Sequence, residues 1–294
     1  QLVEPIFYMA DPQKRIFVGY LIASGLLALW VFSRQGVPIG ARIKTLIIKD
    51  LWLHPSVLLD LKLIVVNNAL WLVLLAPLLG SQIALALACK RLLVELFGRG
   101  DIFSWSSLTV SLIYTLVLFV VDDFARFISH YLYHKLPILW RFHAVHHSAT
   151  VLTPLTLYRV HIIEMMLNAL RSILVTGLIG GIFIYLFHGK IAPMMIFGVA
   201  VFSLLFNLAG SNLRHSQIYL GFGKLERWLI SPAQHQIHHS ADASHFNKNF
   251  GVMMAVWDRL FGTWLSSETE KVTAFGIGGN AKIKQSLWHH IKGL

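Results

Sequence analysis

Three tight clusters of histidine constrain the fold of this chain more than any other feature of its sequence. Residues three and four apart lie on one face of a helix, so two or three imidazoles of one cluster can reach a single ion. Two of the clusters are H-x-x-H-H triplets, which chance would place twice in such a chain on the order of one time in a thousand. The fold must therefore bring these side chains together around metal. The clustered histidines are His130, His134, His143, His146, His147, His235, His238 and His239.

The number of clustered imidazoles predicts two metal ions, because one zinc ion takes only three or four protein ligands. Cys89 is the single cysteine, which excludes a disulfide framework and a thiolate cluster. Histidine, carboxylate and water remain as ligands. Asp123 lies seven residues, about two helical turns, before His130. It is a candidate ligand or a hydrogen-bond partner that orients an imidazole, with an ion pair to Arg126 as the alternative.

The composition predicts an all-α integral membrane protein. The chain is 56% hydrophobic and only 13% charged, with a mean hydropathy of +0.64, whereas soluble proteins contain roughly a quarter charged residues. Stretches that approach the roughly 20 apolar residues needed to cross a bilayer are 16–32, 61–79, 102–121, 165–187 and 192–209. Residues 82–97 include Lys90 and Arg91, so we expect an interfacial or re-entrant helix there. The predicted architecture is four or five transmembrane helices with a helical cytoplasmic cap that carries a histidine-rich dimetal site.

The net charge of +11 indicates which side of the membrane the histidines face. Basic residues gather at Arg34, Arg42, Lys44 and Lys49, between the first two predicted spans, and again in the C-terminal region. The positive-inside rule places both regions, and with them the histidine clusters, on the cytoplasmic side. Anionic lipid head groups or an acidic partner account for this basic charge. The sequence contains no nucleic-acid-binding motif, so we expect no nucleic-acid partner.

Two polar, histidine-bearing blocks, residues 123–162 and 210–294, alternate with apolar ones. The stretch 163–209 between them is long enough to cross the membrane and return, with a break at His188-Gly189-Lys190. Such a transmembrane hairpin brings the third cluster to the side of the first two. We expect a single membrane domain, 1–294, with N-terminal membrane anchor helices at 1–105, a catalytic histidine-motif core at 106–264 and a C-terminal tail at 265–294.

Further motifs follow in a fixed order between Asp122 and Trp264. After H-Y-L-Y-H come L-W-R-F-H-A-V-H-H-S, Y-R-V-H-I-I-E, N-L-R-H, S-P-A-Q-H-Q-I-H-H-S, K-N-F-G and W-D-R-L-F-G-T. In the content and order of these motifs the chain resembles the integral-membrane fatty acid hydroxylase superfamily, often called sterol desaturase-like. One departure is H-Y-L-Y-H, since many members carry an Arg directly after the first His.

The resemblance implies a non-haem di-iron centre that uses dioxygen to hydroxylate, or alternatively to desaturate, an unactivated lipid chain. Carried over by position, it adds His215 to the eight clustered ligands. Asp123, together with His161 and Glu164 of Y-R-V-H-I-I-E, becomes a candidate catalytic residue near the metals. His161 is either a ligand or the partner of one. Zinc binds similar nitrogen sites and can replace iron in purified protein.

The implied substrate is a membrane lipid, such as a fatty acyl chain or a sterol, with its polar head near the cytoplasmic interface. Electrons must come from a ferredoxin, rubredoxin or cytochrome type of partner, or from a small reductant, because the sequence contains no dinucleotide-binding fingerprint. A metal-binding or metal-transport membrane protein is the rival from another class. It is disfavoured because the clusters lie at span ends and not mid-span. The oligomeric state stays open.

Overall fold

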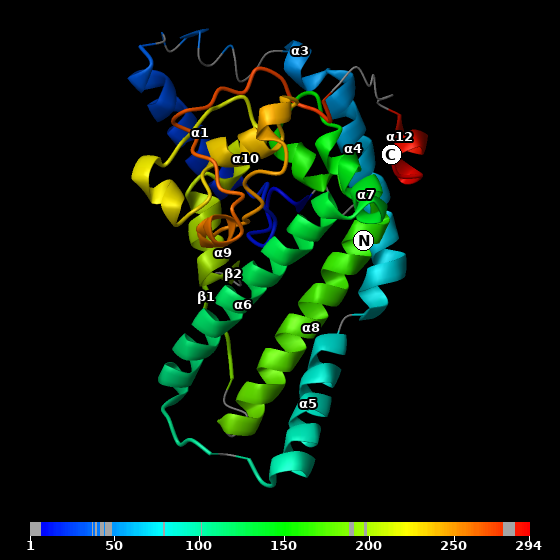
Figure 1. Cartoon of the computed structure of the whole chain (residues 1–294), viewed down its shortest axis with the longest axis vertical. Helices are drawn as coiled ribbons and strands as arrows, with labels where there is room; N and C mark the ends of the chain where they lie inside the picture. The colour runs from blue at the N-terminus through cyan, green and yellow to red at the C-terminus, as the bar shows by residue number, and fades with distance from the viewer. Residues whose placement is uncertain are drawn as a thin grey trace.

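The structure, a computed structural model, describes residues 7–36, 38, 40–41, 44, 49–78, 80–100, 102–187, 191–196, 199–278 and 286–294. Within these residues the regular structure is helical apart from two strands of two residues each. Long helices form a stalk below a broader cap of short helices and loops (Figure 1). The elements are α1 (Val18–Arg34), α3 (Lys49–Trp52), α4 (Pro55–Leu70), α5 (Ser81–Phe97), α6 (Ser107–Lys135), α7 (Pro137–His147), α8 (Ile162–Leu186), β1 (Met195–Ile196), β2 (Val199–Ala200), α9 (Val201–Leu208), α10 (Pro232–His238), α11 (Val256–Leu260) and α12 (Leu287–Ile291).

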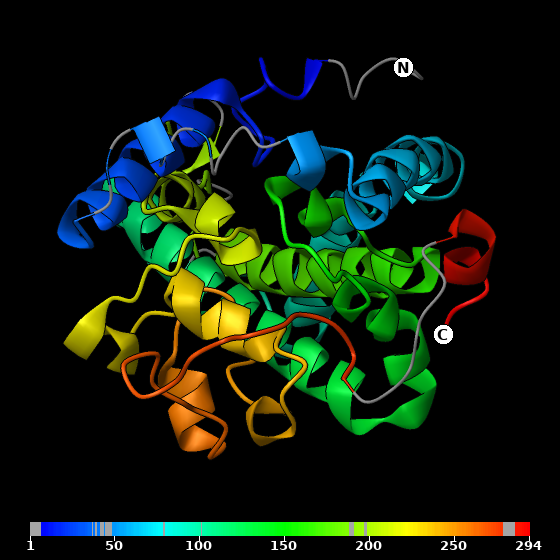
Figure 2. The ribbon, with the colours of Figure 1, turned by 90° about the horizontal axis from the view of Figure 1, so that it is seen from above.

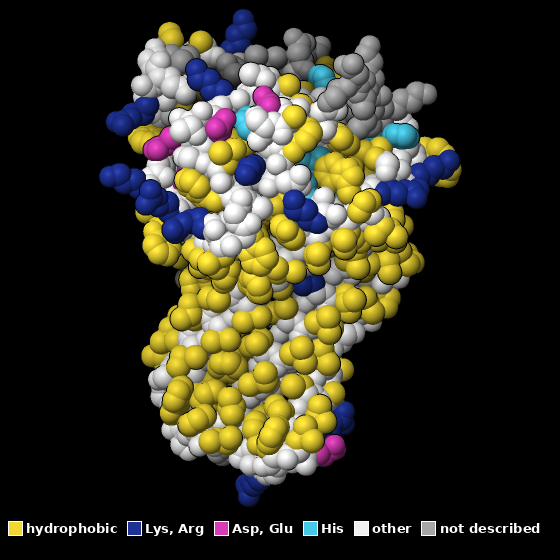
Figure 3. Space-filling model, viewed as in Figure 1, with side chains coloured by type: hydrophobic (Ala, Val, Ile, Leu, Met, Phe, Trp, Pro, Cys, Tyr) yellow, Lys and Arg dark blue, Asp and Glu magenta, His cyan; other side chains and the backbone are white. Residues whose placement is uncertain are grey.

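The stalk consists of α5, α6 and α8, which run side by side (Figure 1). No Pro or Gly interrupts α6, and Ser106 caps its start by accepting a hydrogen bond from Thr109 N, so 29 residues form one helix about 44 Å long. The face of the stalk seen in Figure 3 is mainly apolar, with a few charged side chains at its lower end. A surface of this kind fits the hydrocarbon core of a bilayer, which confirms the predicted membrane fold.

The expectation of an interfacial or re-entrant helix over residues 82–97 is wrong. These residues form α5, which packs along α8 inside the stalk and does not lie across its end (Figure 1). Small residues permit this approach, because a Cβ added at Gly181 of α8 would lie 2.5 Å from Cβ of Cys89 on α5. Lys90 and Arg91 suggested an interfacial helix, but such long side chains can also extend from a spanning helix toward a polar surface.

Three segments of the described chain are long and apolar enough to cross a membrane, namely Pro55–Phe97, α6 and α8. The first of them comprises α4, a π-helical turn (η2, Trp71–Leu75), a 3-10 turn (η3, Ala76–Leu78) and α5. The apolar helix α1 is shorter, at 17 residues. The predicted span at 61–79 and the segment 82–97 therefore belong to one apolar segment, Pro55–Phe97.

The prediction of a further span over 192–209 is wrong for the described residues of that stretch. They form the antiparallel β1–β2 pair and α9, whose eight residues extend only about 12 Å. Pro193 cannot donate a backbone hydrogen bond, and Met194 N donates to Thr115 Oγ1 of α6 at 2.8 Å. The chain still returns to the cap, because α9 leads into η5 (Ser211–His215) (Figure 1). The break expected at His188-Gly189-Lys190 lies outside the described residues.

The N-terminal third of the chain also builds the cap. Ala28 and Val31 of α1 form a buried cluster with Leu213, Ile218 and Leu220. At the other side of the cap, α4 packs against η4 (Pro154–Tyr158) and against α12. Figure 2, a view from above, shows α1 at the left and α4 at the right of the cap. The predicted anchor region therefore supports the segments that carry the histidines.

Candidate metal centre

Nine histidines form two adjoining groups in the cap. Each residue offers one ring nitrogen, and within a group these nitrogens all lie within 4.8 Å of one another. These are the nine residues predicted as ligands, so the fold brings the whole predicted set together. Group A comprises His130, His134, His143, His147 and His238, and group B comprises His146, His215, His235 and His239.

Each H-x-x-H-H triplet supplies both groups. His146 and His147 are neighbours at the end of α7 but belong to different groups, as do His238 and His239 at the end of α10. The rings of His147 and His239 stack with centroids 4.4 Å apart where the groups meet. Two ions bound by the groups would therefore be close neighbours.

The ring nitrogens of group B converge on one another. The Nε2 atoms of His215, His235 and His239 lie 3.0 to 3.3 Å apart. A neutral imidazole carries one proton and one nitrogen lone pair, so three such atoms at this spacing cannot all be satisfied by protons. A metal ion among them would accept the lone pairs.

Group A shows the same convergence. The Nε2 atoms of His134 and His147 lie 3.1 Å apart, and the Nε2 atoms of His143 and His238 are buried without any hydrogen-bond partner among the described residues. Buried nitrogen atoms are rarely left unpaired in a native fold. Together the two groups present a donor set, nine imidazoles, that fits two transition-metal ions.

The backbone of one loop orients two histidines of group A. Nδ1 of His130 donates to Phe250 O at 2.7 Å, and Nδ1 of His238 donates to Lys248 O at 2.8 Å. A proton held on Nδ1 leaves Nε2 free to bind an ion. Between the two carbonyls, Asn249 adopts the left-handed conformation with a φ of 57°. The K-N-F-G motif therefore orients the rings of His130 and His238.

Asp123 fixes this same region to α6 and belongs to neither histidine group. Its carboxylate accepts hydrogen bonds from Met253 N at 3.0 Å, Met254 N at 3.1 Å and Trp257 Nε1 at 2.9 Å. The alternative ion pair with Arg126 is not formed, since Arg126 pairs with Asp122. Three donors already occupy the carboxylate, which favours a supporting role for Asp123 over a ligand role.

Glu164, in the first turn of α8, contacts His143 of group A and is not part of either group. Its Oε2 lies 3.1 Å from Nδ1 of His143, and both side chains are buried. On the next turn of α7, Nδ1 of His146 donates to Arg159 O at 3.3 Å. The segment from Arg159 to Glu164 thus orients one histidine of each group.

His161 caps the start of α8 and lies outside both groups. Its Nδ1 accepts a hydrogen bond from Ile163 N at 3.1 Å, and its Nε2 donates to Ile291 O at 2.9 Å. Both ring nitrogens are used, which disfavours the alternative in which His161 is a ligand. His245 also lies outside both groups. Its side chain is buried, and its Nε2 lies 3.1 Å from Oε2 of Glu270.

The Nδ1 atom of His235 accepts a hydrogen bond, whereas the Nδ1 atoms of His130 and His238 donate one. Nη2 of Arg214 donates to Nδ1 of His235 at 2.9 Å. A neutral His235 therefore carries its proton on Nε2, facing His215, and this proton must leave before that nitrogen binds an ion. Arg214 also donates to Val252 O and Gly251 O, so it connects group B to the loop that orients group A.

Burial favours the neutral form of the histidines in groups A and B, which is the form that binds metal. Removal from water lowers the pKa of His143 to about 3. Burial, followed by the proximity of His143, lowers the pKa of His146 to about 4. Burial first and neighbouring basic side chains second also place the pKa well below its ordinary value for His147, His215, His235, His238 and His239.

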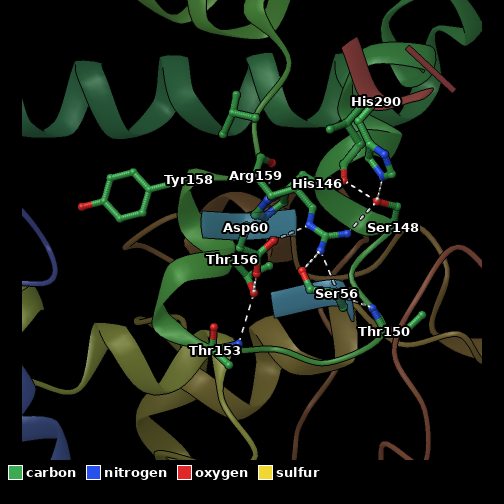
Figure 4. A network of polar contacts seen from close by, with 12 residues as sticks. Ser56, Asp60, His146, Ser148, Thr150, Thr153, Thr156, Tyr158, Arg159 and His290 are labelled. Atoms are coloured by element: carbon green, nitrogen blue, oxygen red, sulfur yellow. Dashed lines mark hydrogen bonds and ion pairs between the residues drawn. The ribbon is translucent and has the colours of Figure 1, made fainter. Parts of the chain in front are cut away.

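A buried ion pair next to His146 of group B joins Arg159, of the Y-R-V-H-I-I-E motif, to Asp60, which no motif marked (Figure 4). Nε of Arg159 donates to Oδ1 of Asp60 at 2.6 Å, and both side chains have no exposed surface. Thr156 Oγ1 donates to the second carboxylate oxygen at 2.9 Å. Nη1 of Arg159 donates to Ser148 Oγ at 3.0 Å, while its carbonyl accepts from His146. For Asp60, the sequence signal that could have indicated such a pair is its position as a single acidic residue in the mainly apolar α4.

The C-terminal helix α12 joins this network. Nε2 of His290 lies 2.8 Å from Ser148 Oγ, and Nδ1 of His290 donates to Ser286 O at 2.7 Å. Arg141 of α7 donates to Lys292 O, and Leu294 N donates to Arg141 O. Sequence reasoning assigned these residues no role, because the contacts join positions more than 140 residues apart.

A cavity of about 290 Å³ reaches group A from the surface of the cap. His134, His147 and His238 line its inner wall. Trp140, Phe246 and Ile277 supply apolar lining. No histidine of group B lines this cavity. A molecule with an apolar chain can therefore approach the position of an ion in group A.

Comparison with known proteins agrees with this geometry. Residues 115–263, just over half of the chain, match the fatty acid hydroxylase family. Ornithine lipid hydroxylase OlsE of Rhizobium tropici is 29% identical over 160 residues, which are 54% of this chain and 44% of that protein. Human alkylglycerol monooxygenase is 26% identical over 154 residues, which are 52% of this chain and 31% of that protein. The Danio rerio alkylglycerol monooxygenase is 27% identical over the same shares.

The matched part of the chain thus spans less than half the length of these relatives. No solved structure matches the chain. The matched region runs from the middle of α6 to the residues after α11 and contains both histidine groups. The chain belongs to the fatty acid hydroxylase family.

Proposed function

We propose that this chain is a membrane-bound, dioxygen-dependent lipid hydroxylase in which groups A and B each hold one iron ion. The observation that carries the proposal is the convergence of nine buried imidazoles beside a cavity with apolar lining. The printed names of the relatives, an ornithine lipid hydroxylase and alkylglycerol monooxygenases, support a lipid as substrate. In this proposal the stalk is the membrane anchor and the cap is the catalytic part.

The ligands in this proposal are the nine histidines of groups A and B. Iron fits a set of imidazole donors as well as zinc does, and bound iron supplies the activation of dioxygen. The other predicted site residues act through the ligands. Glu164 orients His143, and Asp123 holds the loop that orients His130 and His238. These side chains keep the Nε2 atoms aimed at the ions.

The lipid chain is proposed to enter the cavity beside group A. Trp140, Phe246 and Ile277 would contact its methylene groups, while His134 and His147 lie at the inner wall. Hydroxylation places one oxygen atom of O2 in a C–H bond and releases the other as water. Two electrons and two protons must therefore come from a reductant.

The reductant is proposed to be an external donor, either a small acidic protein or a small molecule. Lys135 and Arg141, each next in sequence to a residue of the cavity wall, are exposed on the cap. Together with the net charge of +11, they favour an acidic partner on the cytoplasmic side. Turnover with such a donor should slow as ionic strength rises, and a flat salt dependence would count against docking by charge.

The experiment that tests the function is mass spectrometry of the lipids of a host with and without expression of the chain. A lipid that gains one oxygen atom identifies hydroxylation and names the substrate. Loss of two hydrogens would identify the alternative reaction, desaturation, at the same centre. His238→Ala should abolish the change, whereas His289→Ala, an exposed histidine outside both groups, should not. Unchanged lipids in cells that make metal-loaded protein would contradict the proposal.

A further inference from the structure

A second cavity, of about 360 Å³, lies apart from the metal centre. It is bounded by α6, α8, α9 and the segment before α1, and no residue of group A or B lines it. Residues of β2 and α9 line it. Figure 1 shows these two elements at the level where the stalk meets the cap. The apolar surface gives way to charged side chains at this level (Figure 3). The cavity is therefore at the height expected for lipid head groups.

The lining of this cavity is amphipathic. Its lining includes three residues with hydroxyl groups, Thr115 of α6 and Ser172 and Thr176 of α8. Ser172 and Thr176 are four residues apart, on one face of α8. On another wall the rings of Phe119 and Phe202 stack with centroids 4.1 Å apart. Polar side chains inside spanning helices are costly and commonly mark a ligand pathway.

The charges around the cavity are unbalanced. Asp122 pairs with both Arg126 and Arg171, and Asp123 is occupied by backbone and indole donors. Arg15 forms no ion pair with a described carboxylate. Its Nη2 donates to a backbone carbonyl at 2.8 Å, and its Nε is buried without a partner. Arg15 and Arg126 line the cavity together with Asp122 and Asp123, and Arg171 pairs with Asp122. Three guanidinium groups therefore lie around it against two carboxylates.

Phe206 links this cavity to the metal centre. Its ring lies between the guanidinium groups of Arg15, at 5.6 Å, and of Arg214, at 5.3 Å. Arg214 is the residue that donates to His235. Burial, and then the neighbouring Arg126, lower the pKa of Arg15 only to about 10, so Arg15 is a cation at neutral pH. An anion near Arg15 would offset the mutual repulsion of these cations.

We propose that this cavity binds the phosphate-bearing head group of an anionic membrane lipid. Arg15 and Arg126 hold the phosphate, because planar guanidinium groups match phosphate oxygens and form charge-assisted hydrogen bonds. The hydroxyls of α8 lie on the polar side, and Phe119 and Phe202 contact the start of the acyl chain. This binding site goes beyond the proposed oxygenase function, since it involves neither histidine group.

The test is native mass spectrometry of the purified full chain, with phosphatidylglycerol, phosphatidylcholine or inorganic phosphate added. We expect one tightly retained phosphatidylglycerol and weaker retention of phosphatidylcholine, with no competition from inorganic phosphate. Arg15→Gln should weaken phosphatidylglycerol retention by about tenfold. Arg259→Gln removes an exposed arginine away from the cavity and should leave retention unchanged.

Ser172→Leu provides a second variant, which fills the cavity without changing charge and should also lower retention. Equal retention in the parent, Arg15→Gln and Ser172→Leu would overturn the proposal. Equal retention of the two phospholipids would likewise remove the preference for an anionic head group. Displacement of lipid by inorganic phosphate would show a site for a free anion and would overturn the lipid assignment. Metal content is measured on the same samples. Full metal content together with failed lipid retention would overturn the lipid site alone and leave the oxygenase proposal standing.

Discussion

Asp60 and Arg159 form a fully buried ion pair although they lie 99 residues apart in the sequence, with Nε of Arg159 2.6 Å from Oδ1 of Asp60. Asp60 belongs to α4, in the N-terminal part of the chain. The carbonyl of Arg159 accepts a hydrogen bond from His146 of group B. The pair therefore couples the N-terminal helices to the metal centre.

Asp60→Asn should destabilise the cap and weaken metal binding. The variant keeps the shape of the side chain but leaves a buried guanidinium without its anion, which costs about 3–5 kcal/mol. We expect a lower unfolding temperature and a reduced metal content. Asp242→Asn, which alters an exposed carboxylate, is the matched control and should change neither quantity. An unfolding temperature of Asp60→Asn equal to that of the parent would contradict the role given to the pair.

Asp123→Asn should lower metal content while the stalk stays intact. An amide offers one acceptor oxygen where the carboxylate offers two, so at least one of its three donors loses its partner. A buried unsatisfied donor costs about 1–3 kcal/mol. Trp257→Phe removes only the indole donor and should have a smaller effect. The measurement is metal content per chain together with helicity by circular dichroism, and full metal content in Asp123→Asn would argue against its supporting role.

Gly181→Ala tests the close packing of α5 on α8. The added Cβ would lie 2.5 Å from Cβ of Cys89 and 2.7 Å from Ala86 O, so the helices must move apart. Overpacking of this kind costs about 1–3 kcal/mol. Gly25→Ala in α1 is the control, because a Cβ there meets no atom within 4 Å. Thermal unfolding in detergent should separate the two variants, and equal unfolding temperatures would contradict the packing of α5 in the stalk.

His290→Gln should change how stability depends on pH. Burial, with Arg159 and His289 nearby, lowers the pKa of His290 to about 4, below the roughly 6.5 of an unfolded chain. The unfolded state therefore binds the proton first as the pH falls. The stabilisation by neutral His290 is present above about pH 6.5 and is lost as the pH falls toward 4. A glutamine side chain at this position gains no proton in this pH range, so the variant lacks this contribution to the pH dependence.

The unfolding temperatures of the parent and of His290→Gln should therefore differ at pH 7 and approach each other toward pH 4. His289→Gln, a change at the exposed neighbour, should follow the parent across this range. A difference between the parent and His290→Gln that stays constant with pH would show that the titration of His290 does not contribute.

The histidine clusters could be predicted from sequence because metal ligands require particular residue types at short, regular spacings. His146 and His147 illustrate the limit of that reasoning. Adjacent helical residues point about 100° apart, so one triplet can serve two ions, but only the packed fold shows which residue serves which. Asp60, His290 and the loop at Lys248 and Phe250 were missed as supports. Their contacts join distant segments, and backbone carbonyls leave no signature in the sequence.

The membrane topology was predicted in part. Hydropathy identified α6 and α8 correctly, because their apolar runs are long and uninterrupted. It failed at 192–209, where an apolar composition is compatible with a short hairpin and an eight-residue helix as well as with a span. It also failed at α5. There Lys90 and Arg91 led to the prediction of an interfacial helix, although apolar residues of the same helix pack on Gly177 and Gly181 of α8. Average hydropathy does not record which neighbour a helix meets.

The most direct test of the central claim, two metal ions held by nine histidines, is the metal stoichiometry of the purified chain expressed with iron supplied. We predict about two ions per chain, with a clear loss in His146→Ala from group B and in His147→Ala from group A. His289→Ala should retain both ions. One ion or none per parent chain, or full metal content in both group variants, would contradict the account.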